Sequence, residues 1–239
     1  MNLLSNKRLL IVVAHPDDEL LGPGATIHKL CSNAVPGDLT QIKVVILGEG
    51  ITSRGDLRDP EQWSDELHQH RQNIEDARGI LGYHELSVHN LPDNRFDTVP
   101  LLDIIKIVEH EKSLFDPDVI LTHHNGDVNI DHQLTFQAVM TATRPMQHER
   151  VKTLITFETP SGTEWIPSND ARPFRPNLFL EVSDENMIAK SQAMECYKYE
   201  KRAYPHPRSP EALQIRAKYW GMTVGLPYAE AFQIVRSIG

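Results

Sequence analysis

One segment, Leu9-Leu10-Ile11-Val12-Val13-Ala14 followed directly by His15-Pro16-Asp17-Asp18-Glu19, gives the strongest indication of the fold. Its first part is apolar, rich in β-branched side chains and without polar alternation, which predicts a strand buried on both faces of a parallel sheet. In such a sheet ligands bind beyond the carboxyl ends of the strands. The polar residues that follow the strand therefore lie at a predicted binding edge.

The first 145 residues alternate predicted strands with predicted helices, which is the pattern of βαβ units around a parallel sheet. No internal repeat or long linker interrupts the chain, so we expect a single domain over residues 1–239. The further strands are expected at 42–47, 86–91, 118–122, 151–159 and 177–182. Helices are expected at 23–30, 65–81, 100–114, 132–143 and 184–201, from Ser209-Pro210 onward, and at 228–238.

Composition excludes several classes of partner. The chain has 24 Lys and Arg against 33 Asp and Glu, a net charge of −9. Because a nucleic-acid surface should be basic and no basic run is present, we expect no nucleic acid and no anionic membrane as partner. The apolar stretch at 9–14 is too short for a signal peptide or a transmembrane segment, which predicts a cytoplasmic protein. Cys31 and Cys196 have no metal or redox spacing and are expected to be free, buried thiols.

Two clusters of ionisable residues follow predicted strands. The first is 15–19, whose carboxylates repel one another unless a counter-charge is present. A divalent cation relieves that repulsion, and His with Asp and an open position for water is a zinc-like ligand set. The second cluster, 123–132, reads His-His-Asn-Gly-Asp-Val-Asn-Ile-Asp-His and can face the same crevice. The alternative for the first cluster is a surface loop with a helix-capping Asp, but such a cap needs neither His15 nor Pro16.

The motif Ala14-His15-Pro16-Asp17-Asp18-Glu19, with Asp131-His132 farther on, resembles the PIG-L/LmbE family of zinc-dependent N-acetyl sugar deacetylases. This resemblance implies an α/β, three-layer Rossmann-like (LmbE-like) fold with a mostly parallel central sheet. It also implies a metal-dependent hydrolase that removes the N-acetyl group from an amino sugar or an amino-sugar conjugate. Weaker similarities extend it over most of the chain, at 24–27, 48–50, 70–82, 91–93 and 228–232.

The resemblance also implies roles for individual residues. His15, Asp18 and His132 would hold Zn²⁺, and Asp17 would be the general base toward a metal-bound water. Asp131 would orient a ligand, and Glu19 would support the start of a helix or the ligand set.

Three further positions bear on the substrate and the intermediate. Arg71 and Asp93 match family positions that contact the sugar; the alternatives are an exposed helix charge and a turn residue. Asn129 stands where many members carry a histidine that stabilises the intermediate, and an Asn can donate a hydrogen bond but cannot carry positive charge. The role either passes to His123 or His124 or is weaker here.

Other hypotheses stay open at the level of sequence. The same metal site would serve an amidase that cleaves a different amide of an amino-sugar conjugate. A non-catalytic Rossmann-like binding module is expected to have Gly-x-Gly-x-x-Gly after the first strand, but this chain has carboxylates there. Fe²⁺ or Co²⁺ would also suit His and carboxylate ligands. The sequence leaves the sugar and the number of subunits undetermined, so a homo-oligomer stays open.

Overall fold

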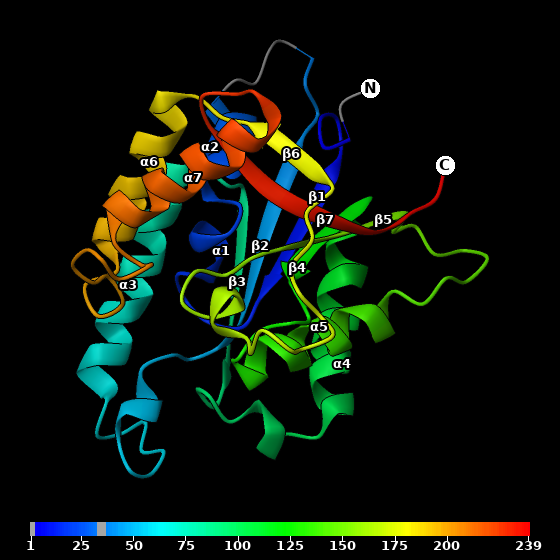
Figure 1. Cartoon of the computed structure of the whole chain (residues 1–239). Helices are drawn as coiled ribbons and strands as arrows, with labels where there is room; N and C mark the ends of the chain where they lie inside the picture. Colours follow the sequence, from blue (N-terminus) through cyan, green and yellow to red (C-terminus); the bar gives the residue numbers. More distant parts are fainter. Residues whose placement is uncertain (1–2, 33–36) are drawn as a thin grey trace.

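The computed structural model describes residues 3–32 and 37–239, and in this part of the chain one seven-stranded sheet forms the centre (Figure 1). The strand order is β3-β2-β1-β4-β5-β7-β6. All pairings among β1 to β5 are parallel, whereas β7 runs antiparallel to both of its neighbours, β5 and β6. The strands are β1 (Arg8–Val13), β2 (Gln41–Gly48), β3 (Glu85–Leu91), β4 (Val119–His123), β5 (Thr153–Phe157), β6 (Leu178–Glu181) and β7 (Ala229–Ser237).

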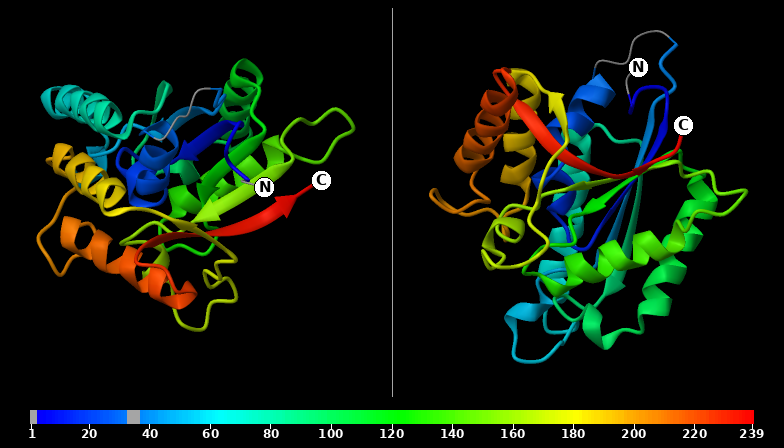
Figure 2. Two further views of the ribbon diagram at one scale, coloured as in Figure 1. Left: turned by 90° about the horizontal axis from the view of Figure 1, so that it is seen from above. Right: turned by 45° about the vertical axis from the view of Figure 1, so that its right-hand side comes forward.

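Helices cover both faces of this sheet, which confirms the predicted three-layer α/β fold (Figures 1 and 2). Helices α1, α2, α3, α6 and α7 pack on one face, and α4 and α5 pack on the other. The helices are α1 (Asp18–Leu21), α2 (Gly24–Ser32), α3 (Ser64–Leu81), α4 (Leu101–Phe115), α5 (Ile130–Ala142), α6 (Asp184–Cys196) and α7 (Pro210–Val224). Three 3-10 turns, η1 (Thr52–Arg54), η2 (Phe96–Thr98) and η3 (Thr163–Trp165), lie in the connecting loops.

Strand β1 is buried on both faces, as its apolar sequence predicts. Ile11 and Val13 belong to the core cluster shared with α3 and α6, whereas Leu10 and Val12 belong to the cluster shared with α4 and α5. Successive side chains of a strand point to opposite faces, so a central strand between two helical layers needs an apolar residue at every position.

The structure corrects the prediction for the end of the chain. Residues 228–238 do not form a helix, because β7 occupies Ala229–Ser237 between β5 and β6. The preceding helix α7 ends at Val224 and is capped by Gly225, which has a positive φ of 75°. This segment forms a strand because both β5 and β6 pair with it through their backbones. Helix α6 also ends at Cys196, earlier than the expected residue 201.

The two cysteines are free, as expected, but only half-buried. Within the described residues, no helix has both the length and the apolar character needed to cross a membrane. A single domain over residues 1–239 stays a prediction.

Candidate metal centre and active site

The candidate site lies where β1 and β4 end. These strands are parallel neighbours, with Leu9 beside Val119 and Val12 beside Thr122, so their carboxyl ends reach the same edge of the sheet. The loop after β1 carries His15 to Asp17 and leads into α1, which begins at Asp18, and the loop after β4 leads into α5, which begins at Ile130. The two sequence clusters therefore meet in space, more than a hundred residues apart in the chain.

Three buried side chains, from the loop after β1 and from the first turns of α1 and α5, converge on one point. Ligand atoms of His15, Asp18 and His132 all lie within 4.8 Å of one another. Asp18 Oδ2 is 3.5 Å from His15 Nδ1 and 3.4 Å from His132 Nε2. Donors about 2.1 Å from a tetrahedral zinc ion lie about 3.4 Å apart, so this donor set fits such an ion in both chemistry and spacing.

A carboxylate stands behind each of the two histidines. Asp131 Oδ2 lies 2.9 Å from His15 Nε2, and its other oxygen accepts a hydrogen bond from the backbone N–H of Phe96. Asp127 Oδ2 lies 3.2 Å from His132 Nδ1. A carboxylate hydrogen-bonded to a metal-binding histidine fixes its tautomer and orientation, as Asp131 does for His15. His15 Nδ1 and His132 Nε2 are then the nitrogens nearer to Asp18 and the ion position.

A second group of possible ligands shares His15 but adds Asp93 and Asp131. It offers one nitrogen, and its carboxylates are already engaged. Asp93 Oδ2 accepts hydrogen bonds from the backbone and hydroxyl of Ser53, at 3.1 and 2.6 Å. The group with two imidazoles is therefore the better zinc site.

Burial and mutual attraction set the charge state of the centre. Burial lowers the pKa of His132, but Asp18 and Asp127 outweigh it and raise that pKa to about 9. His15 behaves in the same way, since burial is outweighed by Asp131 and Asp18 and its pKa lies well above the usual value. Burial also works against ionisation of Asp18, yet the neighbouring His132 and His123 hold its pKa well below the ordinary value. The carboxylates thus stabilise the protonated imidazoles of His15 and His132, and a bound metal cation can replace those protons.

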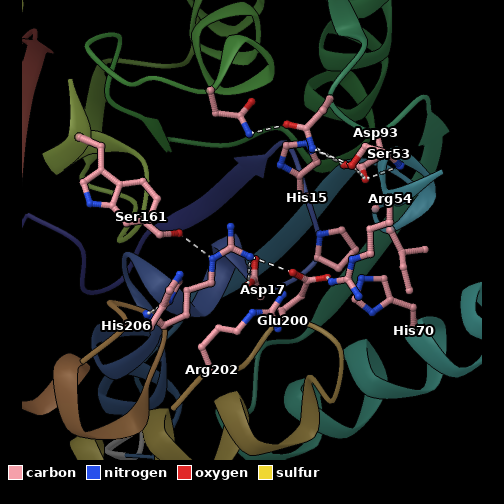
Figure 3. A pocket seen from close by; sticks show the side chains of 17 residues that line it. His15, Asp17, Ser53, Arg54, His70, Asp93, Ser161, Glu200, Arg202 and His206 are labelled. Carbon is pink, nitrogen blue, oxygen red and sulfur yellow. Dashed lines mark hydrogen bonds and ion pairs between the residues drawn. The ribbon is translucent and has the colours of Figure 1, made fainter. Parts of the chain in front are cut away.

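Asp17 lies beside this centre and faces a cavity of about 260 Å³ (Figure 3). Burial raises the pKa of Asp17 well above its usual value, although Arg208 opposes the shift from 3.3 Å. The Asp17 backbone N–H donates to Glu19, whose carboxylate also accepts the Tyr197 hydroxyl at 2.6 Å. Glu19 therefore stabilises the loop through the Asp17 N–H and does not face the candidate metal position.

The remaining predicted residues divide between the cavity and its surroundings. Asp93 lines the cavity, as does Asn129, which caps α5 by accepting a hydrogen bond from the Asp131 N–H and donates to Asn94. Arg71 does not line it, because this exposed side chain donates to Asn90 in a neighbouring hollow.

Neither His123, the last residue of β4, nor the following His124 lines the cavity. His123 is fully buried, accepts the Ala14 N–H at 2.9 Å and stacks on His132. His124 contacts the Arg172 carbonyl oxygen instead. Of His123, His124 and Asn129, only Asn129 lines the cavity.

The C-terminal half supplies one wall of the cavity, which no motif had indicated (Figure 3). Arg208 donates to Glu200 as well as to Asp17, and Glu200 in turn accepts from Arg54. The side chains from this half are Ser161, Trp165, Glu200, Arg202, His206 and Arg208. No sequence motif predicts this wall, because the residues that meet here lie far apart in the chain; Arg208 and Asp17, for example, are 191 positions apart.

The fold and the centre together define an α/β protein with a buried His/Asp group able to bind a metal ion. The profile of the PIG-L family, described as GlcNAc-PI de-N-acetylase, matches residues 10–143. The chain therefore belongs to the PIG-L family of deacetylases.

Among curated proteins, the chain is similar to the uncharacterized deacetylase YaiS of Escherichia coli strain K12, with 29% identity over 201 residues. That match covers 81% of this chain and 93% of YaiS.

Solved structures of similar fold include more than one kind of enzyme. The N,N′-diacetylchitobiose deacetylase of Pyrococcus horikoshii superposes with a TM-score of 0.74 and 16% identity, over 97% of this chain and 84% of that one. GalB, the 4-carboxy-2-hydroxymuconate hydratase of Pseudomonas putida KT2440, gives a TM-score of 0.72 and 20% identity, over 98% of both chains. Similarity at this sequence identity shows the fold alone, and the reaction depends on the chemistry of the residues in the site.

Proposed function

We propose that this protein is a metal-dependent hydrolase that removes the N-acetyl group from an amino sugar or an amino-sugar conjugate. One observation carries the proposal: His15, Asp18 and His132 converge beside Asp17 at the wall of an open, polar cavity. Membership of a deacetylase family supports the same reaction. Zn²⁺ is the proposed ion, and Fe²⁺ or Co²⁺ would suit the same ligands.

When bound, such a cation supplies a Lewis acid for the amide carbonyl oxygen and lowers the pKa of a water molecule to about 7. Asp17 then accepts a proton from the attacking water and returns it to the departing amine nitrogen. The raised pKa of Asp17 helps its carboxyl group to hold the proton between these two transfers. Arg208 donates a hydrogen bond to the Asp17 carboxylate and so helps to hold it in place.

The cavity also offers groups for the sugar and for the developing charge. Because the Asn129 side-chain oxygen caps α5, its amide NH₂ is directed toward Asn94 and the cavity, where it is the proposed donor to the oxyanion. The Asp93 carboxylate, held by Ser53, is the proposed acceptor for sugar hydroxyls. We leave Arg71 out of the proposed substrate contacts because it lies outside this cavity.

The test is release of free amine from a panel of N-acetylated sugars and nucleotide sugars, with Asp17→Asn beside the wild type. We predict that the variant keeps its metal and loses turnover by about 10²- to 10⁴-fold, since only the proton transfer is removed. Asp103→Asn, an exposed acid on α4, is the matched control and should behave as wild type. Full turnover in Asp17→Asn would remove this residue from the mechanism.

An amidase acting on another amide of an amino-sugar conjugate would use the same groups. Varying the acyl chain on one sugar separates the two activities. The deacetylase predicts the highest kcat/KM for acetyl, and a preference for a longer or different acyl group would favour the amidase.

A further inference from the structure

The cavity has a second end, away from the candidate metal centre. In Figure 3, His15 lies to one side of Asp17 and His206 lies to the other. Arg208 spans the space between the two ends, since it donates to Asp17 at 3.3 Å and to Ser161 at 2.7 Å. The proposed reaction takes place at the metal end and gives no role to the side chains of the far end.

Trp165 is the large apolar side chain of this far end. Of the described residues that line the cavity, Trp165 alone is a Trp, Tyr or Phe, and 53% of its surface is exposed. Its indole meets the His206 ring at an interplanar angle of 89°, with ring centroids 5.9 Å apart. This edge-on contact covers only part of the indole, so an aromatic surface stays open at the cavity.

The backbone that carries Trp165 is held in place by hydrogen bonds and an ion pair. The Trp165 N–H donates to the Gly162 carbonyl oxygen at 3.2 Å. The neighbouring Glu164 accepts the Gly162 N–H at 3.2 Å and pairs with Arg216 of α7 at 2.8 Å. A surface that is ordered before its ligand arrives loses less conformational freedom on binding. The turn therefore presents the indole as a prepared binding surface.

A flat aromatic surface in an otherwise polar cavity suits a sugar ring. One face of a pyranose carries C–H groups, and the electron-rich face of an aromatic ring attracts such partly positive hydrogens. Ligand sites commonly combine an apolar surface of this kind with a few polar groups that fix the orientation of the ligand. Stacking on an indole thus complements the polar contacts that the metal end offers.

The ring on Trp165 differs from the ring that carries the reacting amide. That amide has to meet Asp17 and the metal position, which lie at the other end of the cavity. The contacts that link Asp17 to Trp165 run through two side chains, because Arg208 bonds to Asp17 and His206 lies between the Arg208 backbone and the indole. A second ring, joined to the first, is therefore the part of a substrate that reaches the indole.

We propose that Trp165 stacks on a second sugar ring of the substrate, so that the substrate is a disaccharide or a longer glycan rather than a free amino sugar. This inference rests on the proposed function, since it names the substrate class of the same site. Trp165 lies away from the amide that is hydrolysed. It is a specificity-determining residue, and its loss affects binding of the second ring more than the chemical step.

The test compares the methyl glycoside of N-acetylglucosamine, which has one ring, with N,N′-diacetylchitobiose, which has two. Both rings of the disaccharide carry an acetamido group, so the second ring can extend from either side of the reacting one. Trp165→Ala removes the aromatic surface, whereas Trp165→Phe keeps one. Tyr219→Ala is the matched control, because Tyr219 is an exposed aromatic residue of α7 outside the cavity. Calorimetry on zinc-loaded protein carrying Asp17→Asn measures Kd, and kcat and KM are measured with Asp17 intact.

We expect the wild type to bind the disaccharide about tenfold more tightly than the methyl glycoside, and Trp165→Ala to bind the two about equally. The preference lost in Trp165→Ala should appear in KM more than in kcat. Trp165→Phe should keep most of the preference, and Tyr219→Ala should keep all of it. A Trp165→Ala variant that retains the wild-type preference would overturn the assignment, as would a wild type that does not distinguish the two sugars.

The outcomes for Trp165 and for the proposed function are separable. Hydrolysis of both sugars without any dependence on Trp165 removes the stacking contact alone. A preference in binding that depends on Trp165, without hydrolysis of either sugar, removes the deacetylase function and keeps the contact. Neither binding nor hydrolysis of either sugar removes both.

Discussion

Asp17 adopts a backbone conformation that few residues other than glycine take, with φ of +94°. Conformations of this kind cost on the order of 1–3 kcal/mol and persist where the surroundings enforce them, often at active sites. Here the Asp17 N–H is bound by Glu19 and its carbonyl oxygen accepts the first hydrogen bonds of α1. The turn lets His15 and Asp18 face the ion position while Asp17, between them, faces the cavity.

Among individual site residues, the sequence predicted only those that lie next to one another in a motif. The cluster after β1 and Asp131-His132 were predicted, and the structure brings them together. Asp127, behind His132, was visible in the second cluster but had no assigned role, because spacing does not show which carboxylate faces which ring.

We predict that Asp131→Ala lowers zinc affinity by about 10- to 100-fold, since outer carboxylates of this kind orient the metal-binding imidazole. The Kd is measured by competition with a chromophoric chelator, and Asp103→Ala is the control. Unchanged zinc affinity in Asp131→Ala would show that His15 needs no such orientation.

At the scale of elements, the buried parallel strands were predictable because apolar runs bounded by polar loops have few other solutions. Strand β7 was not, because the segment's identity as a strand depends on pairing with β5 and β6, which lie far away in the sequence. A buried ion pair then fixes β7 to the helices. Glu230 accepts from Lys190 of α6 at 2.6 Å and from the N–H groups of Ala25 and Thr26 at the start of α2.

Glu230→Ala is expected to lower the free energy of unfolding by about 3–5 kcal/mol, because it leaves the Lys190 charge buried and unpaired. Urea denaturation measures the change, with the exposed Glu61→Ala as control. The double variant Lys190→Ala/Glu230→Ala should cost less than the sum of the single changes. Strict additivity would mean that the two side chains do not interact energetically.

At the scale of the whole molecule, the three layers are joined by both apolar packing and a few buried charges. Glu111 of α4 contacts Lys43 of β2 at 2.8 Å and His89 of β3 at 2.9 Å. Burial works against ionisation of Glu111, but the hydrogen bonds from Lys43 and His89 outweigh it and hold its pKa below the usual value. A depressed folded-state pKa adds stability that is present above the unfolded pKa of about 4.3 and is lost as the pH falls through the folded pKa.

Glu111→Gln should therefore lower the free energy of unfolding by about 1–3 kcal/mol at pH 7, and the difference from wild type should shrink below about pH 4. Urea titrations at pH 7, 5 and 3.5 measure it. A difference that stays constant over this range would exclude Glu111 ionisation as its source.

We infer that one metal ion is held jointly by His15 and Asp18, which follow β1, and by His132 in the first turn of α5. The most direct measurement is the zinc content of the purified, zinc-saturated protein and of its His15→Ala and His132→Ala variants, with the exposed His148→Ala as control. We predict about one zinc per chain in the wild type and in His148→Ala, and little in either ligand variant. Full zinc occupancy in both His15→Ala and His132→Ala would contradict the shared centre.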